Sequence, residues 1–336
     1  MKKGILFLLL SLSFMINSCD NELELIAPWE DIPVVYGLLS RADEVHYIRV
    51  EKAFLDPKTS ALEIAQNVDS LYYDEHVIVQ LERVKTGDVF NLQKIDGATV
   101  GINREAGVFA NSPNYLYKIN DSEINLQAGE IYRLKIIRGE GLPIVTAETR
   151  VIDDYEFVRA APANPIDFQY KRDITISWRS DDKAAVFFDL NIILYYQETD
   201  PNNPSTFIDK SLNWSVAKNI KREDPTNPRM VYKLPGIEFY QFLGQNIDGS
   251  QKLNRIFRKL DFVVTAGGKE LFDYINVGQA NTGITSSQLI PSFTNLSEGL
   301  GVFSSTNRLV RTNFTVSSTT RDSIRNGVFT KALNFQ

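Results

Sequence analysis

Side chains suited to covalent or metal chemistry are scarce in this 336-residue chain, which has one cysteine, Cys19, and two histidines, His46 and His76. A single thiol cannot form an internal disulfide. A zinc site needs three or four His, Cys or carboxylate ligands. A serine nucleophile needs a base, and no Gly-x-Ser-x-Gly elbow is present. We therefore predict no catalytic, cofactor or metal site, and we expect His46 to be a partly buried, hydrogen-bonded strand residue.

Cys19 has the sequence context of a thiol that is alkylated after secretion. Lys2-Lys3 precede an apolar run from Ile5 to Ile16. The run is shorter than a bilayer span of about 20 residues and is typical of a secretory signal peptide. It ends in Ile16-Asn17-Ser18-Cys19, which resembles the bacterial lipobox, whose cysteine receives diacylglycerol and further acyl chains such as palmitate. We expect a lipoprotein signal peptide over 1–18 and lipidation of Cys19; the alternative is an incidental cysteine after a cleaved signal peptide.

The segment that follows Cys19 is acidic. Asp20-Asn21-Glu22-Leu23-Glu24 is similar to the surface-export signal of Bacteroidota lipoproteins. We therefore expect residues 19–31 to be a lipidated tether and the protein to be anchored to the outer membrane at the cell surface. The inner leaflet of that membrane is the second choice, with the acidic segment then a plain flexible tether.

Composition limits the partners of the folded body. The net charge is -6 and the pI about 5.2, with Lys and Arg scattered along the chain. Such a body has no general attraction for nucleic acid. We therefore predict no nucleic-acid partner and a membrane contact made through the lipid anchor. The length allows two domains.

Alternating apolar and polar residues predict strands in the first half. Val34–Leu39 and Val45–Phe54 are expected to form a hairpin, with Ile48 on one face and Arg49 on the other. Further strands are expected at 76–84, 89–95, 115–119, 131–138 and 143–152, and one short helix between 56 and 69. About seven short strands in this length indicate a β-sandwich over 32–152.

The second half, 153–336, is predicted to be a β-sandwich-like domain with short helices. Strands are expected at 174–178, 185–197, 211–220 and 256–266, and helices at 237–247 and 269–277. The rest is expected to consist of irregular segments and short strands, with Gly299-Leu300-Gly301 as a tight turn that packs Val302 and Phe303 into the core. The predicted fold class is mainly β: two immunoglobulin/fibronectin-III-like sandwiches in tandem.

Three further groups of residues have competing interpretations. Asp153-Asp154 and Asp181-Asp182 could be paired carboxylates of a glycosidase, but we expect solvated turns. Phe239-Tyr240-Gln241-Phe242 and Trp214 could form an aromatic platform for a sugar or partner, and we favour core packing. Ser70 and Ser323, each between Asp and an aliphatic residue, match a short O-glycosylation pattern of Bacteroidota.

Several segments together resemble one family. They are the lipobox, the hairpin over 34–54, Leu126–Leu134, Phe272-Asp273-Tyr274-Ile275 and Gly299–Ser305. They resemble a family of Bacteroidota outer-membrane lipoproteins that is known as domain of unknown function 4249. The resemblance implies a setting like that of lipoproteins beside TonB-dependent transporters, and it supplies no catalytic residue.

Three functions are compatible with these features. The leading hypothesis is a non-enzymatic surface lipoprotein that acts as an accessory or binding subunit beside an outer-membrane β-barrel transporter. The second is an adhesin-like structural protein of the envelope, and the third is a carbohydrate-active enzyme. The identity of a small ligand or glycan is left open.

Overall fold

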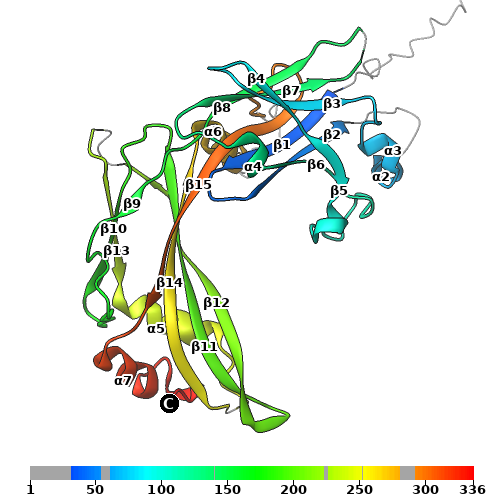
Figure 1. Cartoon of the computed structure of the whole chain (residues 1–336). Coiled ribbons are helices and arrows are strands. Elements are labelled where there is room, and N and C mark those ends of the chain that lie inside the picture. Colours follow the sequence, from blue (N-terminus) through cyan, green and yellow to red (C-terminus); the bar gives the residue numbers. More distant parts are fainter. Residues whose placement is uncertain (1–31, 54–60, 140, 223–225, 252, 281–291) are drawn as a thin grey trace, which may run out of the picture.

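The computed structural model describes residues 32–53, 61–139, 141–222, 226–251, 253–280 and 292–336. Cys19, the signal peptide and the tether lie outside these residues. The described chain is mainly β with short helices, as predicted. In Figure 1 the N-terminal elements form an upper part, and long strands run down from it to the C-terminus. No helix of the described chain is long and apolar enough to cross a membrane.

One eight-stranded sheet runs through both parts, in the order β12-β11-β14-β15-β1-β2-β6-β5. Its strands are β1 (Ile32–Ser40), β2 (Val45–Ala53), β5 (Gln93–Asp96), β6 (Tyr115–Asn120), β11 (Phe187–Asp200), β12 (Asn203–Lys221), β14 (Arg255–Gly267) and β15 (Leu300–Phe314). Neighbouring strands are antiparallel except β1 and β15, which are parallel.

A four-stranded sheet covers the N-terminal end of this sheet and completes a sandwich. Its order is β4-β3-β7-β8, with β3 (Ile78–Arg83), β4 (Asp88–Asn91), β7 (Ile131–Ile137) and β8 (Val145–Arg150). Residues from both sheets, such as Ile48, Leu81 and Leu134, share one core. The single strand predicted over 89–95 is wrong: Leu92 turns into this core, so β4 and β5 lie in different sheets.

Short helical turns connect these strands. They are α2 (Ala61–Ala65), α3 (Val68–Leu71), η2 (Gly97–Val100) and α4 (Asp121–Ile124). The one helix predicted between 56 and 69 is therefore two helices. The second begins where the Asn67 side chain accepts a hydrogen bond from the backbone N–H of Asp69, at 3.0 Å.

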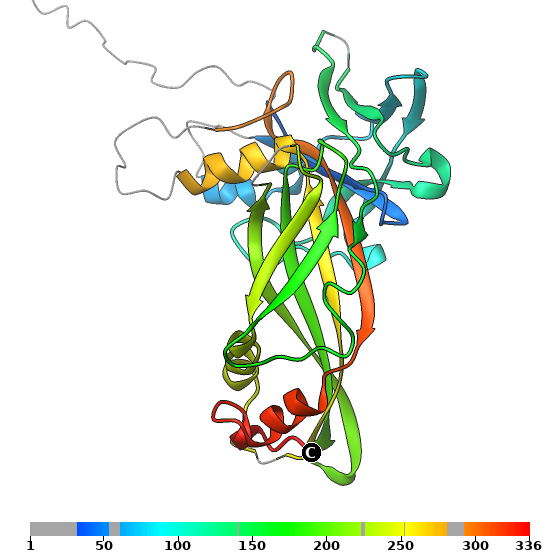
Figure 2. The same ribbon diagram turned by 90° about the vertical axis from the view of Figure 1, so that its left-hand side faces the viewer.

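The C-terminal part packs a three-stranded sheet over the long strands. Its order is β13-β10-β9, with β9 (Glu156–Phe157), β10 (Asp173–Arg179) and β13 (Arg229–Pro235). The helices are α5 (Gly236–Asn246), α6 (Lys269–Ala280), α7 (Ser318–Asn326) and η3 (Lys331–Leu333). The predicted α5 and α6 are confirmed, whereas α7 was not predicted. Figure 2 shows α7 and the C-terminus, in red, at the end opposite α6.

The chain after residue 299 departs most from the prediction of irregular segments and short strands. β15 is a 15-residue strand whose first half pairs with β1 and whose second half pairs with β14; Thr306 pairs with both Ser40 and Gly267. Gly301 belongs to this strand and not to a turn. Its φ is +109°, and a Cβ there would lie 2.0 Å from the carbonyl oxygen of Val35, so only glycine fits. Phe303 is buried, as predicted.

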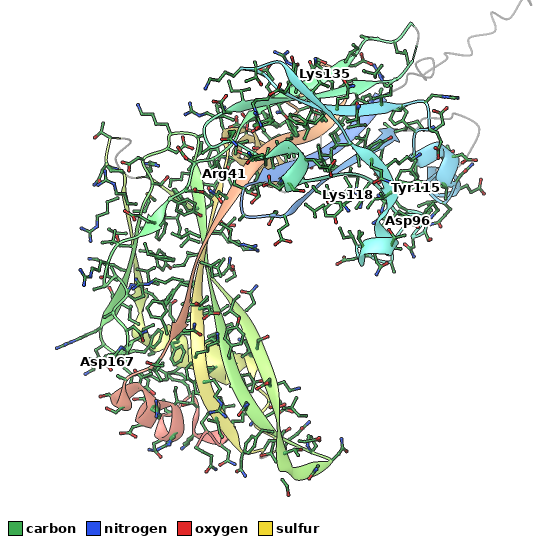
Figure 3. The ribbon with its side chains drawn as sticks, in the orientation of Figure 1. Arg41, Asp96, Tyr115, Lys118, Lys135 and Asp167 are labelled. Atoms are coloured by element: carbon green, nitrogen blue, oxygen red, sulfur yellow. The ribbon has the colours of Figure 1, made fainter. Side chains whose placement is uncertain are left out.

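Polar contacts close the junction between the two parts. Arg41, labelled in Figure 3, places Nη1 2.8 Å from Oδ2 of Asp154. The Asn307 side chain donates to the Asp153 carbonyl oxygen, at 3.1 Å. The hydrophobic cores change over between Val151 and Ile152, next to the predicted boundary at 152/153. The sheet itself has no boundary there, because β15 continues through it.

Candidate functional site

The outer face of the β1–β2 hairpin forms the floor of a cavity. Val34 pairs with Glu51 and Tyr36 pairs with Arg49 across the two strands. Alternate residues of the same strands, such as Val35 and Ile48, point into the core. The strict two-residue period of a strand therefore places an aromatic ring and two charged groups opposite the apolar face.

A short helix and a loop wall this floor. Leu71 at the end of α3 lines the cavity, as do Arg104 and Phe109 of the loop between η2 and β6. The volume is about 650 Å³, which is within the range that holds small organic ligands. Lys52 and Ala53, at the end of β2, complete the side nearest the start of β1.

Two arginines converge on one buried carboxylate. Glu51 is 9 % exposed, and its Oε1 accepts from Nη1 of Arg49 at 2.8 Å and from Nη2 of Arg104 at 2.5 Å. The Arg104 guanidinium also lies 5.1 Å from the centre of the Phe109 ring. Charge-assisted bonds of this kind hold the guanidinium groups in place.

Cations outnumber carboxylates among the residues that line the cavity. The described lining residues include three cations, Arg49, Lys52 and Arg104, and two carboxylates, Glu51 and Glu105. Their formal charges sum to +1, whereas the net charge of the whole chain is -6. A local excess of this sign favours an anion over a cation.

Two buried donors near the Glu51 carboxylate have no hydrogen-bond acceptor within the described part of the chain. They are Nη1 of Arg104 and the hydroxyl of Tyr72, a residue that is 4 % exposed. Burial raises the pKa of Tyr72, and the Arg104 charge opposes this only in part. The hydroxyl is therefore a neutral donor at pH 7. Buried donors without acceptors are rare and call for an explanation.

The rim of the cavity joins the first strand to α6. The Tyr36 ring contacts that of Tyr274 edge to face, with centroids 6.1 Å apart, and the two hydroxyls lie 3.4 Å apart. Burial, followed by this hydrogen bond, raises the pKa of Tyr36 to about 12. The Tyr36 hydroxyl is thus neutral at pH 7.

A second cavity of about 560 Å³ lies on the other side of α3 and shares Lys52 with the first. It is lined by Tyr72, by Asp69 and by Tyr115, which Figure 3 labels close to the two short helices. Lys94 Nζ stands 4.5 Å from the centre of the Tyr115 ring and donates to the Tyr73 carbonyl oxygen. The Lys94 ammonium group is therefore already held by other groups of the protein.

The first cavity is equipped to recognise a ligand by charge and hydrogen bonding. Its described lining residues include no His, Cys or Ser, the side chains that most often act as base or nucleophile. Over the described chain, no three His, Cys, Asp or Glu side chains gather as a metal site would require. The charged lining residues of the cavity are Arg49, Glu51, Lys52, Arg104 and Glu105.

The two histidines lie apart from this arrangement. His46 is 2 % exposed, and its Nε2 lies 3.1 Å from Oδ1 of Asp121, so the prediction of a buried, hydrogen-bonded residue is confirmed. His76 is exposed, and its backbone N–H donates to Asp74 at 2.9 Å.

The carboxylate pairs are structural. Asp153 and Asp154 are exposed, as predicted. The expectation for Asp182 is wrong, because this residue is only 9 % exposed. Its carboxylate accepts from the backbone N–H groups of Asp153 and Ala184, at 2.8 and 2.9 Å, so burial is compensated by turn hydrogen bonds.

The predicted aromatic residues pack in the core. Phe239 and Tyr240 are fully buried, and Trp214 stacks on Phe242 with centroids 5.0 Å apart. Ser70 is a half-buried residue of α3 and Ser323 a half-buried residue of α7. Their O-glycosylation stays a prediction.

Sequence reasoning placed Arg49 on the solvent face but did not identify the cavity. Tyr72 and Arg104 were missed because they come from a helix and a loop whose positions depend on the tertiary fold. A usable signal existed in the family motifs: Tyr36, Tyr274 and Gly301 belong to three segments far apart in the sequence. The structure brings all three to β1 and its neighbours.

Comparisons with known proteins identify a family and no specific activity. No curated protein matches the chain. A solved structure with some similarity is the C-terminal globular domain of an oligosaccharyltransferase from Pyrococcus abyssi, with 11% identity and a TM-score of 0.24. The match covers 70% of this chain and 48% of that one, so this chain spans about half its length.

Another solved structure is the calcium binding domain CBD12 of CALX1.1, with 10% identity, a TM-score of 0.14, and coverage of 82% of this chain and 98% of that one. Likeness this weak supports no functional argument. The family comparison is stronger, because one family profile matches residues 30–312, most of the chain. The chain therefore belongs to the family described as Domain of unknown function (DUF4249).

Proposed function

We propose that this protein is a non-enzymatic lipoprotein of the outer-membrane surface, anchored through Cys19, which acts as a binding subunit beside a β-barrel transporter. The observation that carries the proposal is the sequence Ile16-Asn17-Ser18-Cys19 after a short apolar run. Acyl chains contribute about 0.8 kcal/mol per buried methylene, so lipidation would hold the body at a membrane without a spanning helix.

The position of the cavity supports a role close to the membrane. β1 begins at Ile32, and both Val34 of β1 and Ala53, the pairing partner of Ile32, line the cavity. Residues 20–31 separate Ile32 from Cys19. A fully extended segment of that length spans at most about 40 Å. A ligand in the cavity would therefore be held within reach of a neighbouring membrane protein.

The experiment combines lipid labelling with recovery of a partner. Cells that express the full chain are labelled with a fatty-acid probe, and their membranes are extracted in mild detergent. We expect label on the protein, loss of label and of membrane association in Cys19→Ser, and recovery of a stoichiometric β-barrel partner. Ser18→Ala is the matched control, because it keeps a small residue beside the cysteine.

Two results would contradict this function. An unlabelled protein, or membrane association that survives Cys19→Ser, removes the anchor. A labelled protein that recovers no barrel removes the transporter role and leaves an envelope structural protein as the better explanation.

A further inference from the structure

The outer face of the four-stranded sheet changes from charged to apolar toward one end. In its middle, Oε2 of Glu82 lies 3.0 Å from Nη1 of Arg133 and 2.7 Å from Nζ of Lys135, which is labelled in Figure 3. Toward the start of β3 on the same face, Ile78 pairs with Ile137. Ile78 is 46% exposed. Ion pairs suit a face that meets water, whereas the two isoleucines leave apolar surface uncovered there.

The hairpin between β7 and β8 extends this apolar end. Ile136 and Val145, the last residues that its strands pair, both lie in the core. The next residues outward, Ile137 and Ile144, therefore point to the outer face. Leu142 in the turn is 42% exposed, and Ile144 is 51% exposed. The apolar residues at this end form one group, which we call the hairpin patch: Ile78, Ile137, Leu142 and Ile144.

Hydrogen bonds connect the hairpin patch to the first residues of β1. The buried side chain of Arg138 donates through Nη2 to the carbonyl oxygen of Pro143, at 3.0 Å, and to Oε1 of Glu298, at 2.9 Å. Two residues after Glu298, Leu300 pairs with Val34 of β1. Figure 1 shows β7, β8 and β1 together in the upper part of the molecule, away from the C-terminus. The hairpin patch thus lies at the end of the body where the tether joins it.

We propose that the hairpin patch contacts the lipid surface to which Cys19 is anchored, as a second point of attachment. The proposal rests on the anchor proposed above and adds a fixed orientation of the body. Residues 20–31 span at most about 40 Å, so a patch beside the end of this tether has a high effective concentration at the bilayer. Exposed apolar patches are typical of surfaces that contact a membrane or a partner, and the anchor favours the membrane.

The chemistry of the hairpin suits a shallow contact with neutral lipid. A turn cannot bury its free backbone groups in hydrocarbon, so the side chains reach only the boundary between headgroups and acyl chains, at a depth of about 5–10 Å. Arg138 is paired with Glu298. Glu140, the other charged residue within 138–147, lies outside the described residues. The attraction is therefore apolar, and the contact needs no anionic lipid.

Other exposed apolar residues do not share this position. Val89 and Ile131 are 47% and 41% exposed, but they lie at the opposite end of the same sheet, where Val89 pairs with Glu82 and Ile131 begins β7. Val328 is 73% exposed and follows α7, at the end of the molecule opposite α6 (Figure 2). Position relative to the anchor, and not exposure alone, therefore selects the hairpin patch.

The first test attaches the lipid chemically, because Cys19 is the only cysteine. The mature chain with Trp29→Phe, whose two remaining tryptophans are buried, is coupled through this thiol to a maleimide lipid in phosphatidylcholine vesicles. Ile144→Trp adds a reporter, and lipids brominated on their acyl chains quench it on contact. We expect brominated lipid to remove about half of the reporter emission, whereas the emission added by Val328→Trp should not change.

The second test measures how much the hairpin patch adds to membrane affinity. A single tetradecyl chain attached to Cys19 gives weak, reversible binding to vesicles, so a second contact is visible. Leu142→Ser combined with Ile144→Ser should lower the affinity for neutral vesicles about tenfold. Val89→Ser combined with Ile131→Ser is the matched control, because it removes two aliphatic side chains of similar exposure from the other end of the sheet, and it should change the affinity by less than about twofold.

Two outcomes would overturn the lipid contact. One is equal emission of the Ile144→Trp reporter in brominated and unbrominated vesicles. The other is an equal loss of affinity in the two double variants. Either result would leave the hairpin patch as a surface for a protein partner. Because the lipid is attached chemically, neither result depends on acylation in cells: failed fatty-acid labelling contradicts the anchor, whereas absent quenching contradicts the hairpin contact.

Discussion

The two parts of the molecule treat a buried arginine differently. In the C-terminal part, Arg255 is 2 % exposed, and all three of its nitrogen atoms have acceptors. These are Glu198 at 3.2 Å and the carbonyl oxygens of Leu333 and Asp248 at 2.8 and 2.7 Å. In the N-terminal part, Arg104 shares Glu51 with a second arginine and leaves Nη1 without an acceptor in the described chain.

The difference separates an arginine whose side-chain nitrogen atoms are all paired within the fold from one that keeps an unpaired donor in the described chain. Arg255 ties the last residues of the chain to β14, since its backbone also bonds to Asn334 and Gln336. Arg104 lines a cavity, and it contacts the Glu51 carboxylate, which Arg49 also pairs with, and the Phe109 ring. Arg255 is also more deeply buried, with 3% of its side chain exposed against 15% for Arg104.

The largest expected effect tests the difference between these two arginines directly. Arg255→Met should lower the free energy of unfolding by about 3–5 kcal/mol, because it removes the donor to two carbonyl groups and leaves Glu198 with Lys210, at 3.4 Å, as its remaining cation in the described chain. Arg104→Met should cost less than about 1 kcal/mol, because Arg49 still pairs with Glu51. Urea unfolding of both variants measures the difference, and equal costs would contradict it.

A second prediction tests whether the two parts are independent. Gly301→Ala should cost about 2–3 kcal/mol, because alanine resists a φ of +109° and its Cβ meets the Val35 carbonyl oxygen. Gly87→Ala is the control: its φ is +75°, with no atom within 4 Å of the added Cβ, and we expect a loss of about 1 kcal/mol. Amide hydrogen exchange should show Gly301→Ala weakening both parts; protection lost only in the N-terminal sandwich would argue against a shared β15.

A third prediction compares two buried tyrosines. The Tyr155 hydroxyl lies 2.7 Å from the Val264 carbonyl oxygen and accepts from the N–H of Ala266 at 3.1 Å. Tyr155→Phe should therefore cost about 1–2 kcal/mol. Tyr72→Phe should cost less, about 0.5 kcal/mol, because its hydroxyl lacks an acceptor in the described chain and loses only its interaction with Arg49. Chemical denaturation measures the free energy of unfolding of both variants. A large loss of stability in Tyr72→Phe would contradict the expected difference.

The smallest effect is a dependence on alkaline pH. Burial raises the pKa of Tyr117 to about 12, above the value near 10 of an unfolded chain. The folded state therefore holds its proton more tightly. The resulting stability is complete below pH 10 and is lost as the pH rises toward 12. Urea midpoints at pH 9 and 11 should fall less in Tyr117→Phe than in the wild type; identical slopes would contradict the assignment.

Local patterns predicted the regular elements well. The β1–β2 hairpin, α5 and the core face of β14 follow from alternation and helical periodicity in single short segments. β15 did not, because the strand buries Ser304, Ser305 and Asn307, whose polar side chains are typical of loops. Their partners, such as the Arg150 carbonyl oxygen that accepts from Ser305 at 2.6 Å, come from distant segments.

The cavity, too, could be predicted from the sequence only in part. Its floor was predictable, because Arg49 alternates with core residues on one strand. Its walls were not, because Leu71 and Arg104 are brought over the hairpin by α3 and the loop after η2. No spacing along the chain encodes that approach, whereas the identity of each residue does suggest a donor once its position is known.

The pairing of β1 with β15 also affects how the protein is made. Val34 pairs with Leu300, so about 270 residues must be synthesised after the first strand before its neighbour exists. During that interval β1 has a free hydrogen-bonding edge, a known route to aggregation. Truncation near the C-terminus should leave an incomplete first sandwich and not a shorter, intact protein.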